Sequence, residues 1–217
     1  MKTLTKEMQS SITPSMALDL LKDGNKRFVN NLKINRNLLQ QANETSVGQH
    51  PFAVILSCID SRTSAELIFD QGLGDVFSVR IAGNVVNEDI LGSMEFGCKV
   101  AGAKIIVVLG HTRCGAVKGA CDNVELGNLT SLINKIKLAV QQESTITNDR
   151  TSSNTEFVEK VAELNVVNSV NNILLHSPII AEMVNNGEIS IVGGVHDISS
   201  GEVKFFEKDF NFPALRF

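Results

Sequence analysis

The sequence has no tryptophan and no tyrosine, so its eleven phenylalanines are the only large aromatic side chains available to a core. Cysteine is also sparse, with four in 217 residues, at positions 58, 98, 114 and 121. Cysteines scattered through a chain long enough to bury its own core are unlike the framework of a small disulfide-rich protein. Cys98 and Cys121 fit buried fillers, which leaves Cys58 and Cys114 as candidates for chemistry.

Long apolar runs and basic blocks are missing as well. No stretch approaches the ~20 apolar residues that span a bilayer, and the first residues lack the apolar segment and cleavage site of a signal peptide. The net charge is −4, without a cluster of Lys and Arg of the kind that binds nucleic acid. We therefore expect one domain over residues 1–217, located in the cytoplasm, with neither membrane nor nucleic acid as a partner.

The first candidate site residues directly follow an apolar run. Residues 52–56 predict a buried strand, and Cys58, Asp60 and Arg62 come immediately after it. Open α/β sheets place their chemistry in the loops at the carboxyl ends of strands. A thiol, a carboxylate and a guanidinium at such an end therefore indicate a functional loop.

A second buried strand is predicted at 104–109, and His111 and Cys114 follow it. One tight turn can aim two side chains three residues apart at a common point. Together with Cys58 they provide three ligands and an open fourth position, as in catalytic zinc sites. The other enzymatic hypothesis is a cysteine nucleophile paired with His111, but this hypothesis leaves Cys58 without a role.

Strand and helix patterns alternate along the rest of the chain. We expect further strands at 75–80 and 189–192, an edge strand at 201–206, and helices at 13–31, 64–70, 90–101, 116–121, 129–140, 157–175 and 179–184. The polar segment 30–48 predicts an arm or long loop with room for a short helix, and the polar segment 141–154 predicts a linker. This order predicts an α/β fold: a central, mostly parallel four-stranded sheet plus an edge strand, flanked by helices, with an N-terminal helical arm over 1–48. Right-handed crossovers would then bring the strand-end loops to one edge.

The two motifs, Cys-x-Asp-x-Arg after one strand and His-x-x-Cys-Gly after another, resemble those of the β-class carbonic anhydrases. The resemblance also covers the helix around 17–28 and the segments 79–84 and 193–197. It implies a lyase that binds Zn²⁺ through Cys58, His111 and Cys114 and hydrates CO2 reversibly to bicarbonate and a proton by attack of a zinc-bound hydroxide. It also implies self-association as a dimer or tetramer, in which the arm clasps the partner.

The resemblance gives Asp60 and Arg62 the role of a catalytic dyad. A bidentate pair with Arg62 would orient Asp60 toward the zinc-bound water and keep it off the metal. In some family members the matching Asp instead becomes a fourth zinc ligand at low pH, and either state is open to this chain. Because two thiolates neutralise the zinc charge, activity is expected to rise on the alkaline side.

The substrate pocket is also implied by the resemblance. Gln49 matches an amide that hydrogen-bonds substrate, Phe77 and Phe96 match two pocket aromatics, and the backbone at Gly115 would face an anion such as bicarbonate. Because the family's pocket lies at a dimer interface, Gln49 or Phe96 can serve the zinc of the neighbouring subunit. His50 is a candidate proton shuttle.

One type in the family has a bicarbonate-regulated closed state that requires Trp and Gly where this chain has Leu56 and Ser57. We therefore expect the constitutively open type. Four further polar residues are expected to be structural. Arg80 and Asn84 would brace the site or interface through hydrogen bonds, and His176 and His196 would lie away from the metal motifs.

Two other functions remain open at this point. The same zinc chemistry can act on a CO2-like molecule such as carbon disulfide or carbonyl sulfide. Alternatively, Asp60 could close a purely structural zinc site. Arg62 and Gln49 argue against the structural site, because a permanently closed site needs neither.

Overall fold

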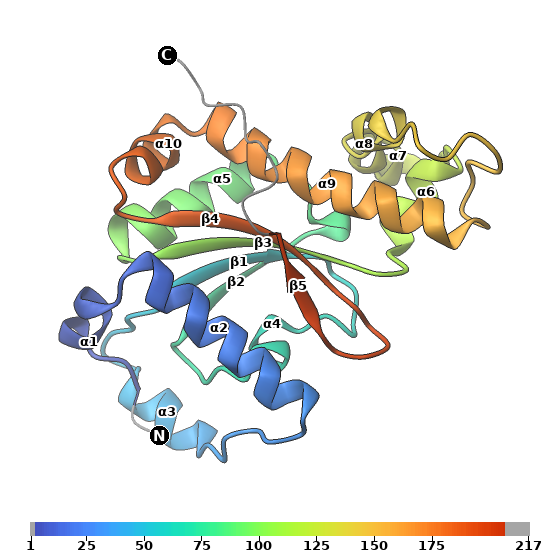
Figure 1. Ribbon diagram of the computed structural model, residues 1–217. Coiled ribbons are helices and arrows are strands. Elements are labelled where there is room, and N and C mark those ends of the chain that lie inside the picture. The colour runs from blue at the N-terminus through green and yellow to red at the C-terminus, as the bar shows by residue number, and fades with distance from the viewer. Residues whose placement is uncertain (1–2, 207–217) are drawn as a thin grey trace.

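The computed structural model describes residues 3–206, while residues 1, 2 and 207–217, which the expected single domain also includes, lie outside the described residues. A five-stranded sheet has the order β2-β1-β3-β4-β5 (Figure 1). Four strands are parallel: β1 (Ala53–Ser57), β2 (Val76–Arg80), β3 (Ile105–His111) and β4 (Ser190–His196). The short β5 (Val203–Phe205) pairs antiparallel with β4, so the predicted parallel sheet with one edge strand is confirmed.

Helices cover both faces of the sheet (Figure 1). One face carries α5 (Glu88–Glu95), α9 (Thr155–His176) and α10 (Pro178–Asn185), and the other carries α1 (Lys6–Ser11), α2 (Pro14–Val29) and α4 (Ala65–Ile68). Beyond one end of the sheet lie α6 (Gly115–Cys121), α7 (Gly127–Asn134) and α8 (Lys137–Gln142). None of the helices in the described part of the chain is long and apolar enough to cross a membrane.

The core forms because strand side chains alternate between the two faces. In β1, Val54 and Leu56 join the cluster under α9 and α10, whereas Ala53 and Ile55 join the cluster under α2 and α4. Every residue of β1 and β3 is buried, as expected for central parallel strands covered on both sides. This rigid centre fixes where the two strands end, and both motifs begin there.

The N-terminal segment packs against its own chain. Helix α2 begins at Pro14 after the cap Thr13, whose side chain accepts from the backbone N–H of Met16, and it buries Ala17 and Leu21. The arm or loop predicted over 30–48 includes a short helix, α3 (Leu38–Glu44), whose N-terminus is capped by the side chain of Asn37. The clasp of a partner by residues 1–48 stays a prediction.

Two predicted helices differ in detail. The helix expected at 90–101 is α5 continued by a π-helical turn, η2 (Phe96–Val100). The helix expected at 129–140 is interrupted at Lys135 and Ile136, between α7 and α8. At this interruption Ile136 is fully buried, and its backbone N–H donates to Ile133 O as in a tighter turn.

Candidate metal centre

The carboxyl ends of β1 and β3 bring the two motifs together. Ser57 at the end of β1 lies opposite Leu109 of β3, so Cys58 and His111 both emerge at the same edge of the sheet. Cys114 is the residue that precedes helix α6. The turn between His111 and Cys114 contains Arg113 in the left-handed region, with a φ of +57°, which folds Cys114 back toward the strand end.

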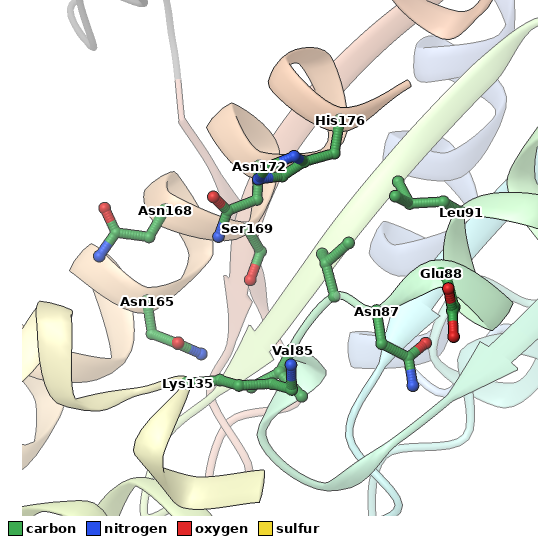
Figure 2. Close-up of a pocket in the computed structure, with 11 residues that line it drawn as sticks. Val85, Asn87, Glu88, Leu91, Lys135, Asn165, Asn168, Ser169, Asn172 and His176 are labelled. Carbon is green, nitrogen blue, oxygen red and sulfur yellow. The ribbon is translucent and has the colours of Figure 1, made fainter. Parts of the chain in front are cut away.

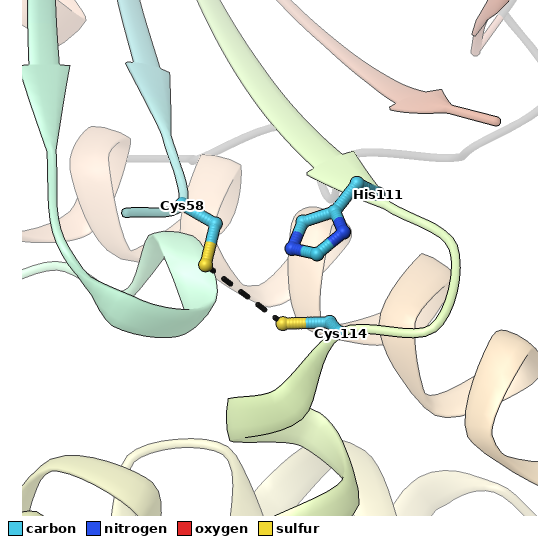
Figure 3. Close-up of side chains that lie close together, drawn as sticks. All are labelled: Cys58, His111 and Cys114. Carbon is cyan, nitrogen blue, oxygen red and sulfur yellow. Dashed lines mark hydrogen bonds between the residues drawn. The ribbon is translucent and has the colours of Figure 1, made fainter. Parts of the chain in front are cut away.

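Cys58, His111 and Cys114 converge on a single point (Figure 3). Their ligand atoms all lie within 4.8 Å of one another, and the two sulfur atoms are 4.0 Å apart. The exposed fractions of the three residues are 4%, 0% and 1%, respectively. A buried set of two sulfurs and one imidazole nitrogen matches the ligand chemistry of zinc.

The hydrogen bonds of His111 fit a metal ligand. Its Nδ1 lies 2.9 Å from the carbonyl oxygen of Thr112, which can only accept, so the ring proton sits on Nδ1. Its Nε2 is buried and has no hydrogen-bond partner among the described residues. A backbone carbonyl that fixes the tautomer, with a free lone pair on the other nitrogen, is the usual arrangement of a zinc-binding histidine. The residues present therefore fit a zinc ion.

The two cysteines have opposite pKa shifts. The hydrogen bond from the Cys114 thiol lowers the pKa of Cys58 despite burial, and His111 and the backbone N–H of Gly83 lower it further. The pKa of Cys114 is raised, first by this hydrogen bond to Cys58 and then by burial. Burial opposes the charged form of His111, but the neighbouring Cys58 raises the pKa of His111 on balance. Zinc binds thiolates, so its binding would release a proton from this pair.

Asp60 and Arg62 form a two-point ion pair beside this group. Arg62 Nε lies 3.0 Å from Asp60 Oδ1 and Arg62 Nη2 lies 2.8 Å from Oδ2. These hydrogen bonds hold the pKa of Asp60 well below its usual range, so the carboxylate is ionised at neutral pH. Among the described residues, the group of ligand atoms within 4.8 Å of one another includes Cys58, His111 and Cys114 but not Asp60.

Arg80 braces the loop from behind, as the sequence led us to expect. Its Nε donates to the carbonyl of Cys58 at 3.0 Å and its Nη2 donates to the carbonyl of Asp60 at 2.6 Å. Both carbonyls are thereby tied to the end of β2. Arg80 therefore fixes the backbone of this loop. Its two hydrogen bonds involve neither the Cys58 sulfur nor the Asp60 carboxylate.

The predicted pocket residues divide into two groups. Gly115 follows Cys114 directly, and a Cβ placed there would meet nothing within 4 Å, so the space beside its backbone is open. Phe77 and Phe96 lie edge to face, with ring centroids 6.2 Å apart, and line a hollow between β2 and α5 that includes none of the three candidate ligands. Gln49 is exposed just before β1. Within one chain, these last three residues stay apart from the metal group.

Three neighbours of the group are not predicted by the sequence pattern. The backbone N–H of Gly83 donates to Cys58 Sγ at 3.3 Å, and the backbone N–H of Arg113 donates to Glu159 at 2.9 Å. His196 of β4 lies opposite His111 in the sheet register. The prediction that His196 is remote from the metal motifs is therefore wrong. Burial and the charge of His111 lower the pKa of His196 to about 4. Only the order of the strands reveals this pairing.

Comparisons with known proteins identify similar chains. The family model described as "Carbonic anhydrase" matches residues 53–203. "Carbonic anhydrase 2" of Mycobacterium tuberculosis is 35% identical over 189 residues, which are 87% of this chain and 90% of that protein. The solved structure of the β-carbonic anhydrase CafA of Aspergillus fumigatus has a TM-score of 0.69 and 26% identity, covering 89% of this chain and 90% of that one. One of two tetrameric β-carbonic anhydrases of Sordaria macrospora shares the fold, with a TM-score of 0.69, 24% identity, and coverage of 88% and 94%.

Proposed function

We propose, since this chain belongs to the β-class carbonic anhydrase family, that it catalyses the reversible hydration of CO2 to bicarbonate and a proton with zinc held by Cys58, His111 and Cys114. The observation that carries this proposal is the buried convergence of two sulfurs and the unpartnered Nε2 of His111 next to an ionised Asp60. Zinc bound there would act as a Lewis acid that lowers the pKa of a coordinated water. The chain's own residues must then position substrate and handle the proton.

Asp60 and Arg62 are proposed to act as a unit. Two hydrogen bonds from Arg62, together with its backbone N–H at 2.9 Å from Oδ1, hold the Asp60 carboxylate in one orientation. An ionised carboxylate in this position accepts a hydrogen bond or a proton and does not donate one. Joining the metal as a fourth ligand would require Asp60 to give up these bonds, which supports the open form of the site.

The apolar surroundings favour a small neutral substrate. Val85 and Val117, both almost fully buried, belong to the same hydrophobic cluster as Cys58 and Cys114. We propose that this apolar packing around the two cysteines favours a small neutral molecule such as CO2 over larger anions. Gly115, with open space beside its backbone, is proposed as a contact for the bicarbonate product.

Self-association as a dimer or tetramer is proposed to complete the pocket. Phe96 and Val100 have exposed fractions of 54% and 73%, and the ring of Phe96 lies against Phe77 on β2, the outer strand of the sheet. A partner covering them would place Gln49, Phe77 and Phe96 near its own zinc, and the Sordaria macrospora proteins are described as tetrameric. We expect Phe96→Arg to shift the sedimentation coefficient toward the monomer and to lower turnover at full zinc content. A variant with parental sedimentation and turnover would contradict this.

The cytoplasm is the proposed location. All four cysteines are free, and two of them must stay reduced to bind metal.

The proposed activity is tested by stopped-flow CO2 hydration, at pH 7 and 8.5, on protein with measured zinc content. Turnover should scale with bound zinc and exceed the rates with carbonyl sulfide and carbon disulfide. Cys114→Ser should lose both zinc and turnover, whereas the matched Cys121→Ser, at a buried cysteine outside the ligand group, should retain both. Full zinc occupancy without CO2 turnover would refute the proposed activity while leaving the zinc site intact.

A further inference from the structure

A pocket of about 490 Å³ lies between α9 and the segment that leads into α5 (Figure 2). Side chains of α9, including Asn165, Ser169 and Asn172, face Val85 and Asn87 across it. Asn165 and Ser169 are buried polar residues, unlike their partly exposed neighbour Asn168. Buried polar side chains require hydrogen-bond partners, and the partners here lie on the backbone of the turn η1 (Ala82–Asn84).

Asn165 and Ser169 are one helical turn apart and hold successive carbonyls of that turn. Asn165 Nδ2 donates to Gly83 O at 2.8 Å, and Ser169 Oγ donates to Asn84 O at 3.0 Å. Both bonds lie on one face of α9, because residues i and i+4 of a helix are neighbours. Helix α9 therefore fixes the orientation of two consecutive peptide groups.

The other side of the same turn faces the metal group. The backbone N–H of Gly83 donates to Cys58 Sγ at 3.3 Å, while its carbonyl accepts from Asn165. Gly83 has a φ of +70°, a conformation that glycine adopts freely, so its own backbone does little to hold it in place. The position is also closely packed, since a Cβ there would lie 2.7 Å from Ile136 Cδ1 and 3.1 Å from Ala116 Cβ. A flexible residue in a tight space needs an external anchor to keep its N–H on the sulfur.

We propose that Asn165 is a positioning residue that aims the Gly83 N–H at Cys58 and thereby limits how strongly the Cys58 thiolate donates electrons to bound metal. A hydrogen bond to a metal thiolate draws charge from the sulfur, which is one way in which a protein tunes its metal. The inference rests on the proposed zinc site, but it concerns a side chain that does not itself ligate the metal.

The first test uses the unmodified sequence loaded with cadmium-113. A cadmium ion on Cys58 should show a scalar coupling to the amide proton of Gly83 through the N–H···S hydrogen bond in nuclear magnetic resonance spectra. Cadmium that binds to Cys58 without this coupling would overturn the inference and leave the proposed zinc site standing. Failure of cadmium to bind to Cys58 at all would remove both.

The second test removes the anchor. Asn165→Leu and the equally sized Asn165→Asp both delete the amide donor to Gly83 O. In the cobalt(II)-loaded variants, the thiolate-to-cobalt absorption should move to longer wavelength, because a sulfur that has lost a hydrogen bond gives up electron density more easily. The cadmium coupling of Gly83 should weaken in the same variants.

The matched control is Asn168→Leu, the same substitution three residues further along α9. The side chain of Asn168 donates to Gln142 and, among the described residues, makes no hydrogen bond to the turn, so the cobalt spectrum should stay as in the parent. An unchanged spectrum in both Asn165 variants would overturn the proposal. So would a general loss of folding in both, because a residue that only positions the turn leaves the fold intact.

Discussion

Arg62 holds both carboxylate oxygens of Asp60 from only two residues away along the chain, at 3.0 Å and 2.8 Å. The pair lies on the loop that also carries Cys58, so the orientation of the carboxylate is coupled to the position of a proposed zinc ligand. Because Arg62 is largely exposed, the pair contributes little to stability. Its significance lies in orientation.

Asp60→Asn should therefore reduce catalysis without loss of metal. The amide keeps the size of the carboxylate but no longer accepts a proton, and losing a positioned acid or base costs about 10²–10⁴-fold in rate. We expect kcat/KM for CO2 hydration to fall by about this range at unchanged zinc content. Arg62→Gln should lower it less, because Asp60 keeps its charge. Parental turnover in Asp60→Asn would rule out the dyad.

Arg80 gives a separate prediction, because it holds backbone and not functional atoms. Arg80→Met removes both donors to the carbonyls of Cys58 and Asp60. We expect zinc affinity to fall by about 10–100-fold, as found for other partners that orient metal ligands. Competition with a chromophoric chelator measures this. Arg113→Met serves as the comparison, because among the described residues the side chain of Arg113 makes no hydrogen bond to the loop that carries Cys58 and Asp60. Equal affinities would contradict the bracing role.

The fold and the three candidate ligands could be predicted because their signals are local. The apolar runs before Cys58 and His111 identify central strands, and parallel strands covered by helices must end at one edge. The spacing of His111 and Cys114 then needs only one turn to bring them together. Nothing beyond short-range sequence pattern was required.

The remaining features depend on tertiary placement. That His196 lies beside His111 follows from β4 pairing with β3, and that Gly83 reaches Cys58 follows from a left-handed turn held by α9. The sequence around the break at Ile136 has no Gly or Pro, and its apolar pattern continues through the break, so no local signal predicts it. The side chains of Phe77 and Phe96 meet each other but not the metal group, and the role that the resemblance gives them needs a second chain.

Gly24 tests how closely α2 packs against the rest of the chain. A Cβ at this position would lie 1.8 Å from the carbonyl oxygen of Phe69, a backbone atom that cannot rotate away. Gly24→Ala should lower the free energy of unfolding by about 1–3 kcal/mol, as overpacking does. Gly119→Ala in α6, where the nearest atoms are 3.9 Å away, should instead raise it by about 0.5–1 kcal/mol. Urea titrations of both variants measure these changes. An unchanged free energy of unfolding in Gly24→Ala would show that α2 packs loosely against Phe69.

Asp70 predicts a pH dependence of stability. Its side chain is 3% exposed and pairs with Arg27 and Arg36. Burial works toward a higher pKa, but hydrogen bonds from these two arginines outweigh it and lower the pKa of Asp70 below its ordinary value of 3.8. A carboxyl with a lowered pKa in the folded state contributes stability above its unfolded pKa and loses it as the pH falls through the folded pKa. The contribution of Asp70 should thus be complete at neutral pH and decline as the pH falls below about 4.

Asp70→Asn isolates this contribution. At pH 7 the variant should be less stable by about 3 kcal/mol, because two partly or fully buried guanidiniums lose their counter-charge. The difference from the parent should shrink as the pH falls from 4 toward 3, since the parent carboxylate is then being protonated. Asp23→Asn, at an exposed pair with Lys26, should change stability by less than about 1 kcal/mol at any pH. Urea unfolding of the three proteins between pH 3 and 7 measures the effect, and a constant difference between parent and Asp70→Asn would mean that the ion pairs do not set the pKa of Asp70.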